Sequence, residues 1–351
     1  MIRNRVLSDH STEPSDLILP LNLINRTVPE KMSKTFFAMG TVMNLTFCGN
    51  YVQKALDEAA ALISKLDSLL ARMRTDSEIT QLNISTNNRW IKVHDDTNAV
   101  LREALLYAEK TNGAYDPAIG ALVDLWDIKH CDNRDEQELP DGAKIQETLL
   151  ICDYRHIETD HAGHYRVLNS ASIDLGGIAK GYAADRVYEL CRQQEISSAL
   201  ISLGTSSLAA MGVKPDGNPW KIGLKGIDEN KNACFGVVYL KDQFLSTSGD
   251  YEQYFMKDSR RYHHIIDKKT GYPSNSGLRS VTVISNNGAL SEAYSTALLI
   301  MGLDKALSFQ KSEGGFEAIF VTSDKHVVCT EGILSKFKFR GKTLGYHCNQ
   351  I

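Results

Sequence analysis

The sequence lacks the features that mark membrane proteins and nucleic-acid-binding proteins. Its apolar runs, such as residues 297–301, are far shorter than the ~20 residues that cross a bilayer. Lysine and arginine number 39 against 43 aspartates and glutamates, so the net charge is −4 and no basic excess is available to neutralise a nucleic-acid backbone. We therefore expect no transmembrane helix, no membrane association and no nucleic-acid partner.

Cysteine-pair motifs and an export signal are missing as well. The seven cysteines form no C-x-x-C pair, and a chain of 351 residues is long enough to fold without disulfides. His130 and Cys131 are neighbours, but they lack the second ligand pair that a zinc site needs. Charges scattered from Arg3 to Arg26 interrupt the N-terminus, where a signal peptide would have an apolar segment. These features predict a cytoplasmic protein with reduced thiols.

The pattern of apolar residues predicts an α+β fold with largely antiparallel sheets. Apolar residues spaced three or four apart predict helices at 52–72, 97–111, 119–126, 178–193, 290–301 and 305–311. Strands are predicted at 37–47, 156–159, 165–168, 199–203, 220–224, 236–240, 244–247, 263–266, 280–284, 318–322 and 326–329. Regular βαβ alternation is missing, which excludes a parallel doubly wound sheet.

The chain divides into a short arm and one large unit. Residues 1–34 contain three prolines and little periodicity, which predicts a poorly ordered or surface-lying arm. Residues 35–351 form the expected folded domain. Within it, residues 127–141 are charged and aperiodic, so we expect a surface excursion there.

A glycine pair between a strand end and a helix start is a candidate phosphate site. The segment DLGGIAKG, residues 174–181, offers free backbone N–H groups at a helix N-terminus, with Lys180 one turn inside. Asp174 could accept hydrogen bonds from a heterocycle or a sugar. A tight turn whose glycines serve only backbone geometry is the alternative, because the segment is neither a Walker loop nor a GxGxxG motif.

Two further segments carry groups suited to catalysis. His263 and His264 alternate faces on a predicted strand, so at most one of them faces a given cleft. Glu292 and Thr296 share one helix face, an oxygen-rich arrangement suited to a hard ion such as Mg²⁺. The alternative for the histidines is an ordinary role in a strand, and the alternative for Glu292 is a solvated helix N-terminus. Neither segment, taken by itself, excludes its alternative.

The order of the segments is more specific than any one of them. It runs through MGT (39–41), DSE (76–78) with Asn83, YDP (115–117), DLGGIAKG (174–181), SGDY (248–251), HIID (264–267) with TG (270–271), and EAYST (292–296). That order resembles the ApbE family of FAD:protein FMN transferases over residues 36–335. The resemblance implies a T-fold-like α+β flavin transferase domain. It also implies cleavage of FAD, attachment of FMN through its phosphate to a Thr or Ser of an acceptor flavoprotein, and release of AMP.

The resemblance also implies roles for individual residues. His264 corresponds to the histidine that activates the acceptor hydroxyl. The expected Mg²⁺ ligands are the Gly177 carbonyl and the side chains of Glu292, Ser295 and Thr296. The positions expected to contact the substrate FAD are Met39, Met73, Ala114, Tyr115, Asp116, Asp174, Lys180 and Ile266.

The chain departs from the family pattern at three positions. Glu292 replaces the usual Asp, Gly204-Thr205-Ser206 replaces Gly-Gly-Asn, and Met73 replaces a residue that is often aromatic. The family's frequent lipobox or signal sequence is also missing. Two alternative functions stay open: a Mg²⁺-dependent FAD pyrophosphatase that releases FMN and AMP, and a non-catalytic FAD-binding protein.

Overall fold

The computed structural model describes residues 30–85, 89–128, 138–227 and 233–350. Its helices are α1 (Val52–Leu70), α2 (Glu78–Ile84), α3 (Asp95–Lys110), α4 (Gly120–Trp126), α5 (Gly142–Leu149), α6 (Ala179–Gln193), α7 (Gly288–Met301) and α8 (Leu303–Glu313), with short 3-10 turns η2 (Tyr154–His156), η3 (Glu331–Ile333) and η4 (Gly341–Leu344). Its strands are β1 (Glu30–Ala38), β2 (Thr41–Gly49), β3 (Ile91–Lys92), β4 (Ile157–Thr159), β5 (His164–Val167), β6 (Ile196–Leu203), β7 (Ser207–Met211), β8 (Trp220–Lys225), β9 (Cys234–Leu240), β10 (Gln243–Gly249), β11 (Tyr254–Lys257), β12 (Arg260–His263), β13 (Ile266–Asp267), β14 (Tyr272–Pro273), β15 (Leu278–Ser285), β16 (Phe316–Thr322), β17 (His326–Cys329), β18 (Phe337–Phe339) and β19 (His347–Gln350).

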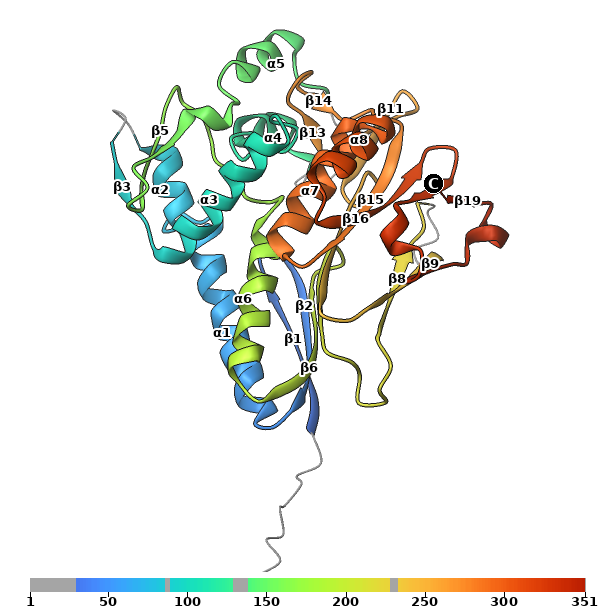
Figure 1. Ribbon diagram of the computed structural model, residues 1–351. Coiled ribbons are helices and arrows are strands. Elements are labelled where there is room, and N and C mark those ends of the chain that lie inside the picture. Colours follow the sequence, from blue (N-terminus) through green and yellow to red (C-terminus); the bar gives the residue numbers. More distant parts are fainter. Residues whose placement is uncertain (1–29, 86–88, 129–137, 228–232, 351) are drawn as a thin grey trace, which may run out of the picture.

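A nine-stranded sheet forms the centre of the molecule, in the order β1-β2-β6-β7-β10-β15-β16-β17-β19. Among the described strands of this sheet, neighbours are antiparallel except for the pair β17 and β19. In Figure 1, α1 and α6 lie side by side along β1, β2 and β6, and α7 lies beside β15. The prediction of an α+β fold with largely antiparallel sheets is confirmed.

The two faces of the central sheet are covered by different layers. Phe320 of β16 belongs to the apolar core beneath the helices, whereas its neighbours Ile319 and Val321 belong to a second core. That second core lies under the small sheet β18-β9-β8, which supplies Trp220 and Val238. Because strand residues alternate faces, β7, β10, β15, β16 and β17 each contribute to both cores.

Helices α6 and α7 approach each other so closely that their backbones touch. A Cβ atom on Gly181 would lie 2.2 Å from the carbonyl oxygen of Gly288, and one on Gly288 would lie 2.4 Å from that of Gly181. Asp185 of α6 accepts hydrogen bonds from the N–H groups of Gly288 (2.6 Å) and Ala289 (2.9 Å) at the start of α7. Burial raises the pKa of Asp185 to about 7 although both hydrogen bonds favour its charged form.

A third, smaller core supports the loops at one end of the molecule. Trp126 of α4 donates a hydrogen bond from Nε1 to the carbonyl of Gly271 (2.7 Å) and stacks on Tyr262 of β12. Ile145 of α5 and Phe255 of β11 complete the cluster. This core connects the helices of residues 120–149 to the hairpins of residues 254–273.

Several elements differ from the sequence predictions. The strand predicted at 37–47 is a hairpin, because Met39 and Gly40 both adopt positive φ angles, the conformation of a two-residue turn. The strand predicted at 263–266 is divided between β12 and β13. Helix α5 was not predicted, and neither were β18 and β19, so residues 326–329 do not form the last strand.

The structure describes only part of the predicted N-terminal arm (1–34) and of the predicted surface excursion (127–141). Strand β1 begins at Glu30, so residues 30–34 belong to the sheet and not to a poorly ordered arm. Residues 1–29 lie outside the described residues, as do residues 129–137 of the predicted excursion. Among the described helices, none is both long and apolar enough to cross a membrane.

Because the backbones of α6 and α7 are in contact, one methyl group added at Gly181 should have a large effect on the stability of the fold. Gly181→Ala should lower the free energy of unfolding by about 1–3 kcal/mol, because the new Cβ must push the two helices apart. The measurement is urea denaturation followed by circular dichroism. Gly142→Ala is the matched control, since a Cβ on Gly142 meets nothing within 4 Å and should change stability by less than about 0.5 kcal/mol. Equal midpoints for the two variants would contradict the close contact.

Candidate active site

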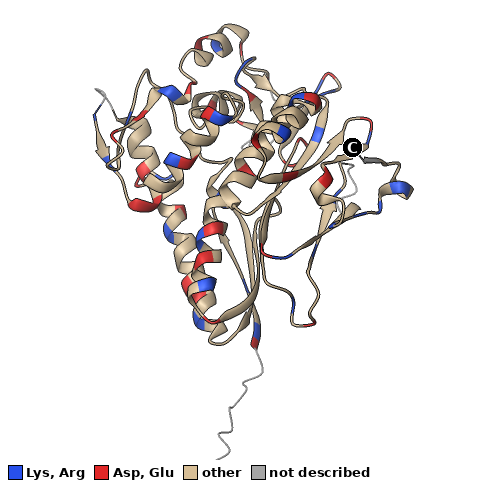
Figure 2. Cartoon of the chain, viewed as in Figure 1, with Lys and Arg blue, Asp and Glu red and all other residues tan. Residues whose placement is uncertain are grey.

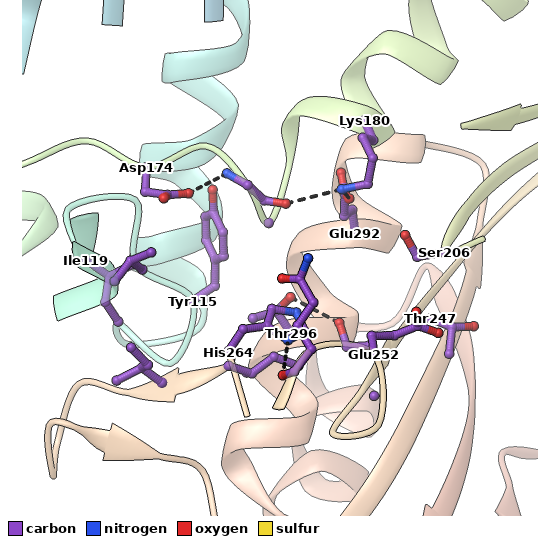
Figure 3. A pocket seen from close by; sticks show the side chains of 18 of the residues that line it. Tyr115, Ile119, Asp174, Lys180, Ser206, Thr247, Glu252, His264, Glu292 and Thr296 are labelled. Atoms are coloured by element: carbon purple, nitrogen blue, oxygen red, sulfur yellow. Dashed lines mark hydrogen bonds and ion pairs between the residues drawn. The ribbon is translucent and has the colours of Figure 1, made fainter. Parts of the chain in front are cut away.

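The main cavity lies where the N-terminal parts of α6 and α7 meet the loops above the sheet. It has a volume of about 380 Å³ and is lined by segments from seven separate regions of the sequence. These lie within residues 39–41, 114–123, 174–180, 204–206, 247–253, 264–266 and 292–300. Figure 3 shows that Lys180, Glu292 and Thr296 come from the two helices, while Tyr115 and Asp174 lie on the opposite wall.

The loop that carries Asp174 is held by main-chain contacts on both sides. Asn83 of α2 donates to the carbonyl of Ile173 (3.0 Å) and accepts from its N–H (2.7 Å). The N–H of Asp174 donates to the carbonyl of Pro117 (2.8 Å). These bonds place the YDP segment beside the DLGG segment, although 57 positions separate Pro117 from Asp174 along the chain (174 − 117).

The Asp174 carboxylate takes part in a charge network at the edge of the cavity. Its oxygens accept hydrogen bonds from the Gly176 N–H (2.7 Å) and from Arg72 Nη1 (3.0 Å). Arg72 also pairs with Asp124 of α4. Arg72 lies after the end of α1, where no sequence pattern indicated a functional role, and only the structure brings it to this wall.

Glu292 is buried on α7 and has a compensating partner for each carboxylate oxygen. Oε1 lies 2.6 Å from Lys180 Nζ and accepts a hydrogen bond from the Ser207 hydroxyl (3.0 Å). Oε2 accepts a hydrogen bond from the Gly181 N–H (2.6 Å). The ion pair neutralises a charge that burial would otherwise disfavour, and it joins the first turn of α6 to α7.

Hydroxyl groups gather one turn farther along α7. The Ser248 hydroxyl lies 2.9 Å from that of Ser295 and 3.1 Å from that of Thr296. Gly177 adjoins them, since a Cβ there would lie 3.6 Å from the Thr296 hydroxyl and 3.1 Å from the Tyr115 ring. The described residues contain no group of three or more His, Cys, Asp or Glu side chains that could hold a metal. One carboxylate with several hydroxyls therefore suits a hard cation that also takes oxygens from a substrate.

The Tyr115 side chain supplies an unsatisfied polar atom at the cavity wall. The residue is 3% exposed, and its hydroxyl has no hydrogen-bond partner among the described residues. Burial raises the pKa of this phenol well above its ordinary value, so it stays protonated and can donate a hydrogen bond. An unpaired buried hydroxyl costs about 1–3 kcal/mol, which a bound acceptor group would offset.

The two adjacent histidines point to different surroundings, although His264 lies in the link between β12 and β13 and not in a strand. His264 is half-buried and lines the cavity, where Figure 3 shows it on the wall opposite Lys180. Its Nδ1 lies 3.3 Å from the carbonyl oxygen of Gln253. A hydrogen bond to a carbonyl requires a proton on Nδ1, so Nε2 is the ring nitrogen that carries the lone pair. His263 is buried away from the cavity.

The comparisons with known proteins agree with this geometry. The model of the ApbE family matches residues 39–320, which is most of the chain. The chain belongs to the ApbE family. The FAD:protein FMN transferase of Treponema pallidum is 32% identical over 302 residues, covering 82% of each chain. The fold matches the ApbE protein of Thermotoga maritima with a TM-score of 0.80 and 28% identity, over 88% of this chain and 99% of that one. The apo flavinyl transferase ApbE of Pseudomonas stutzeri matches with a TM-score of 0.73 and 27% identity, over 84% and 92% of the two chains.

The cavity brings together most residues that the ApbE resemblance singled out. The residues of this set that line the cavity are Met39, Ala114, Tyr115, Asp116, Asp174, Gly177, Lys180, His264, Ile266, Glu292 and Thr296. Ser295 is not among the lining residues, but its hydroxyl lies 2.9 Å from that of Ser248, which lines the cavity. Met73 lies instead in an adjoining cavity of about 320 Å³, where it is 70% exposed and shares the lining with Arg72 and Lys180. Ser248 and Ser206 line the main cavity but were not among the predicted ligands.

The Asp116 carboxylate has partners within the protein. It accepts hydrogen bonds from the N–H groups of Ala118 (2.8 Å) and Tyr154 (3.2 Å) and pairs with Lys268. Burial raises the pKa of this carboxyl, and Lys268 acts in the opposite direction. The carboxylate therefore connects the 264–268 loop to the YDP segment.

Proposed function

We propose that this protein is a Mg²⁺-dependent FAD:protein FMN transferase with a Thr or Ser of an acceptor flavoprotein as its second substrate. One observation carries the proposal: a single cavity joins the buried Lys180–Glu292 pair, the hydroxyl cluster around Thr296 and a histidine with a lone pair on Nε2. Relatives that cover about four-fifths of the chain are named FAD:protein FMN transferases. Phosphoryl transfer needs this combination of positioning, charge compensation and a base.

The transfer replaces one phosphorus–oxygen bond by another. The acceptor hydroxyl oxygen attacks the phosphorus on the riboflavin side of FAD, and the bond from that phosphorus to the bridging oxygen breaks. AMP leaves with the bridging oxygen, and the hydroxyl proton passes to Nε2 of His264. Tyr115 and Lys180 line the cavity, and we expect their donor groups to bind the phosphate oxygens.

The donor chemistry of α7 supports a bound Mg²⁺ ion. Glu292, Ser295, Thr296 and the Gly177 carbonyl would hold it, with Ser248 close to both hydroxyls. An ion held there would supply positive charge to compensate the pyrophosphate oxygens of FAD. Glu292 has a longer side chain than the Asp that is usual at this position in the family, and it pairs with Lys180. The Lys180 ammonium therefore lies next to the carboxylate oxygens that are expected to bind the ion.

A cytoplasmic site of action is part of the same proposal. The six cysteines within the described residues are all free, and Cys131 lies outside those residues. Free thiols are typical of proteins in reducing compartments. The acceptor would then be a cytoplasmic flavoprotein.

The direct test of the function is a product analysis. The protein is incubated with FAD, Mg²⁺ and candidate flavoproteins, and the acceptors are examined by intact-mass and peptide mass spectrometry. A covalent FMN adduct on a Thr or Ser, with one AMP released per adduct, is the expected result. Free FMN with AMP and no adduct would indicate a pyrophosphatase instead, and bound but uncleaved FAD would indicate a flavin carrier.

Removal of the Glu292 charge should weaken the Mg²⁺ dependence. Glu292→Gln retains the size of the side chain, but it removes the charge and replaces one accepting oxygen by a donating NH₂ group, so it ligates a hard cation poorly. We expect the Mg²⁺ concentration for half-maximal transfer to rise at least ~10-fold. Glu189→Gln, on the exposed face of α6, is the control and should leave it unchanged. An unchanged Mg²⁺ titration in folded Glu292→Gln protein would contradict the ligand assignment.

Loss of the His264 ring should abolish transfer without abolishing FAD binding. His264→Ala removes the proton acceptor but none of the expected FAD or metal ligands, so transfer should fall by a factor of ~10²–10⁴. The measurement pairs adduct formation with FAD fluorescence titration. His164→Ala, at a surface histidine of β5 paired with Asp160, is the control. Transfer at the parental rate in His264→Ala would show that another group takes the proton.

A further inference from the structure

The environment of His263 differs from that of a side chain that merely fills the core. The residue ends β12 and is 3% exposed. Its Nε2 lies 2.8 Å from the carbonyl oxygen of Ser274, and its Nδ1 lies 3.3 Å from the N–H of Ile265. Both contacts are with main-chain groups: Ile265 belongs to the link that carries His264, and Ser274 directly follows β14. Strand alternation alone predicts that His263, on the face away from the cavity, can be replaced freely.

These contacts determine the protonation state of the ring. A carbonyl oxygen accepts only from an N–H, so Nε2 carries the proton, and the Ile265 N–H donates only to a lone pair, so Nδ1 is bare. A second proton would place two donors against each other at Nδ1. Burial lowers the pKa of His263, which agrees with a ring that stays neutral.

Two hydrogen bonds hold the main chain around His264. The His263 ring accepts from the Ile265 N–H, and the Gln253 carbonyl accepts from the His264 N–H. The His264 N–H donates to the Gln253 carbonyl (3.1 Å), which also faces His264 Nδ1. The next peptide N–H, that of Ile265, is the group that binds His263. The Ser274 N–H donates to the Ile265 carbonyl (2.9 Å), so His263 and Ser274 together hold Ile265 at both of its polar groups.

We propose that His263 is a positioning residue: its bare Nδ1 holds the Ile265 N–H and thereby aims the His264 ring at the acceptor hydroxyl. This inference rests on the proposed transfer function, because it assigns His264 as the proton acceptor. A displacement of about 1 Å at a reacting group can cost ~10²-fold in rate, so a loosened 264–265 peptide is expected to lower the rate of transfer. Because His263 itself does not line the cavity, its replacement should affect FAD binding far less than transfer.

Two amide variants separate the two contacts of the ring. Asn places an oxygen near the position of Nδ1 and can accept from Ile265, whereas Gln reaches the position of Nε2 and can donate to Ser274. Leu fills the space with neither. We expect His263→Leu and His263→Gln to lower kcat for FMN transfer by ~10–10²-fold with an FAD dissociation constant within ~3-fold of the parent. His263→Asn should recover most of that loss.

A spectroscopic readout tests the positioning without relying on turnover. In ¹⁵N-histidine-labelled protein, the ring shifts of His264 report which nitrogen carries the proton. Parental protein and His263→Asn should show a protonated Nδ1, and His263→Leu and His263→Gln should show a mixture of tautomers. If the parental enzyme transfers no FMN, the proposed function fails, and these shifts still decide whether His263 orients His264.

Three results would overturn the inference. The first is parental kcat in folded His263→Leu, and the second is an unchanged His264 tautomer in both His263→Leu and His263→Gln. The third is equal loss in the Asn and Gln variants together with equal loss of thermal stability, which would make His263 a purely structural residue. If His263→Leu does not fold, the comparison of Asn with Gln carries the test.

Discussion

The close contact between Gly181 and Gly288 determines where the charged groups of the site lie. Lys180 immediately precedes Gly181 on α6, and Glu292 lies one turn beyond Gly288 on α7. Because neither glycine has a side chain, the helices approach until the Gly181 N–H itself binds Glu292. Any larger residue at either position would separate the ammonium and the carboxylate, and with them the hydroxyls of the next turn. The geometry of the cavity floor therefore depends on the packing of two backbones.

Charge compensation explains how so many ionisable groups are tolerated around one cavity. Glu292 pairs with Lys180, Asp174 with Arg72, Asp116 with Lys268, and Asp250 with Arg261 and Arg279. Removal of one partner from a buried pair costs about 3–5 kcal/mol, because the remaining charge is left in a low-dielectric environment. The pairs hold the walls together and leave the uncharged donors, such as the Tyr115 hydroxyl, for a ligand. Figure 2 shows both signs of charge distributed along the described helices.

The loop of His264 depends on a different part of the molecule from the helices. The Trp126 core holds Gly271, Lys268 ties the loop to Asp116, and the ring of His263 holds the Ile265 peptide. The proposed phosphate and Mg²⁺ side of the site is thus supported by α6 and α7, while the side of the proposed base, His264, is supported by hairpins that pack on α4. A substitution in either support is expected to affect one half of the proposed reaction more than the other.

The sequence alone indicated the longer elements and the candidate reacting groups, because both are read from local patterns. The 3.6-residue periodicity of α1, α3 and α6 comes from apolar residues close together in the chain, and the ordered motifs were sufficient to identify the ApbE family. Short elements such as α5 and β19 were missed because they carry too few apolar repeats to be distinguished from loops. The tertiary structure decided which polar groups meet. Arg72 reaches Asp174, Ser248 reaches Thr296, and Lys268 occupies the carboxylate of Asp116, all through contacts between residues more than 40 positions apart. No local pattern encodes such contacts, since they arise from the folding of distant segments around a common core.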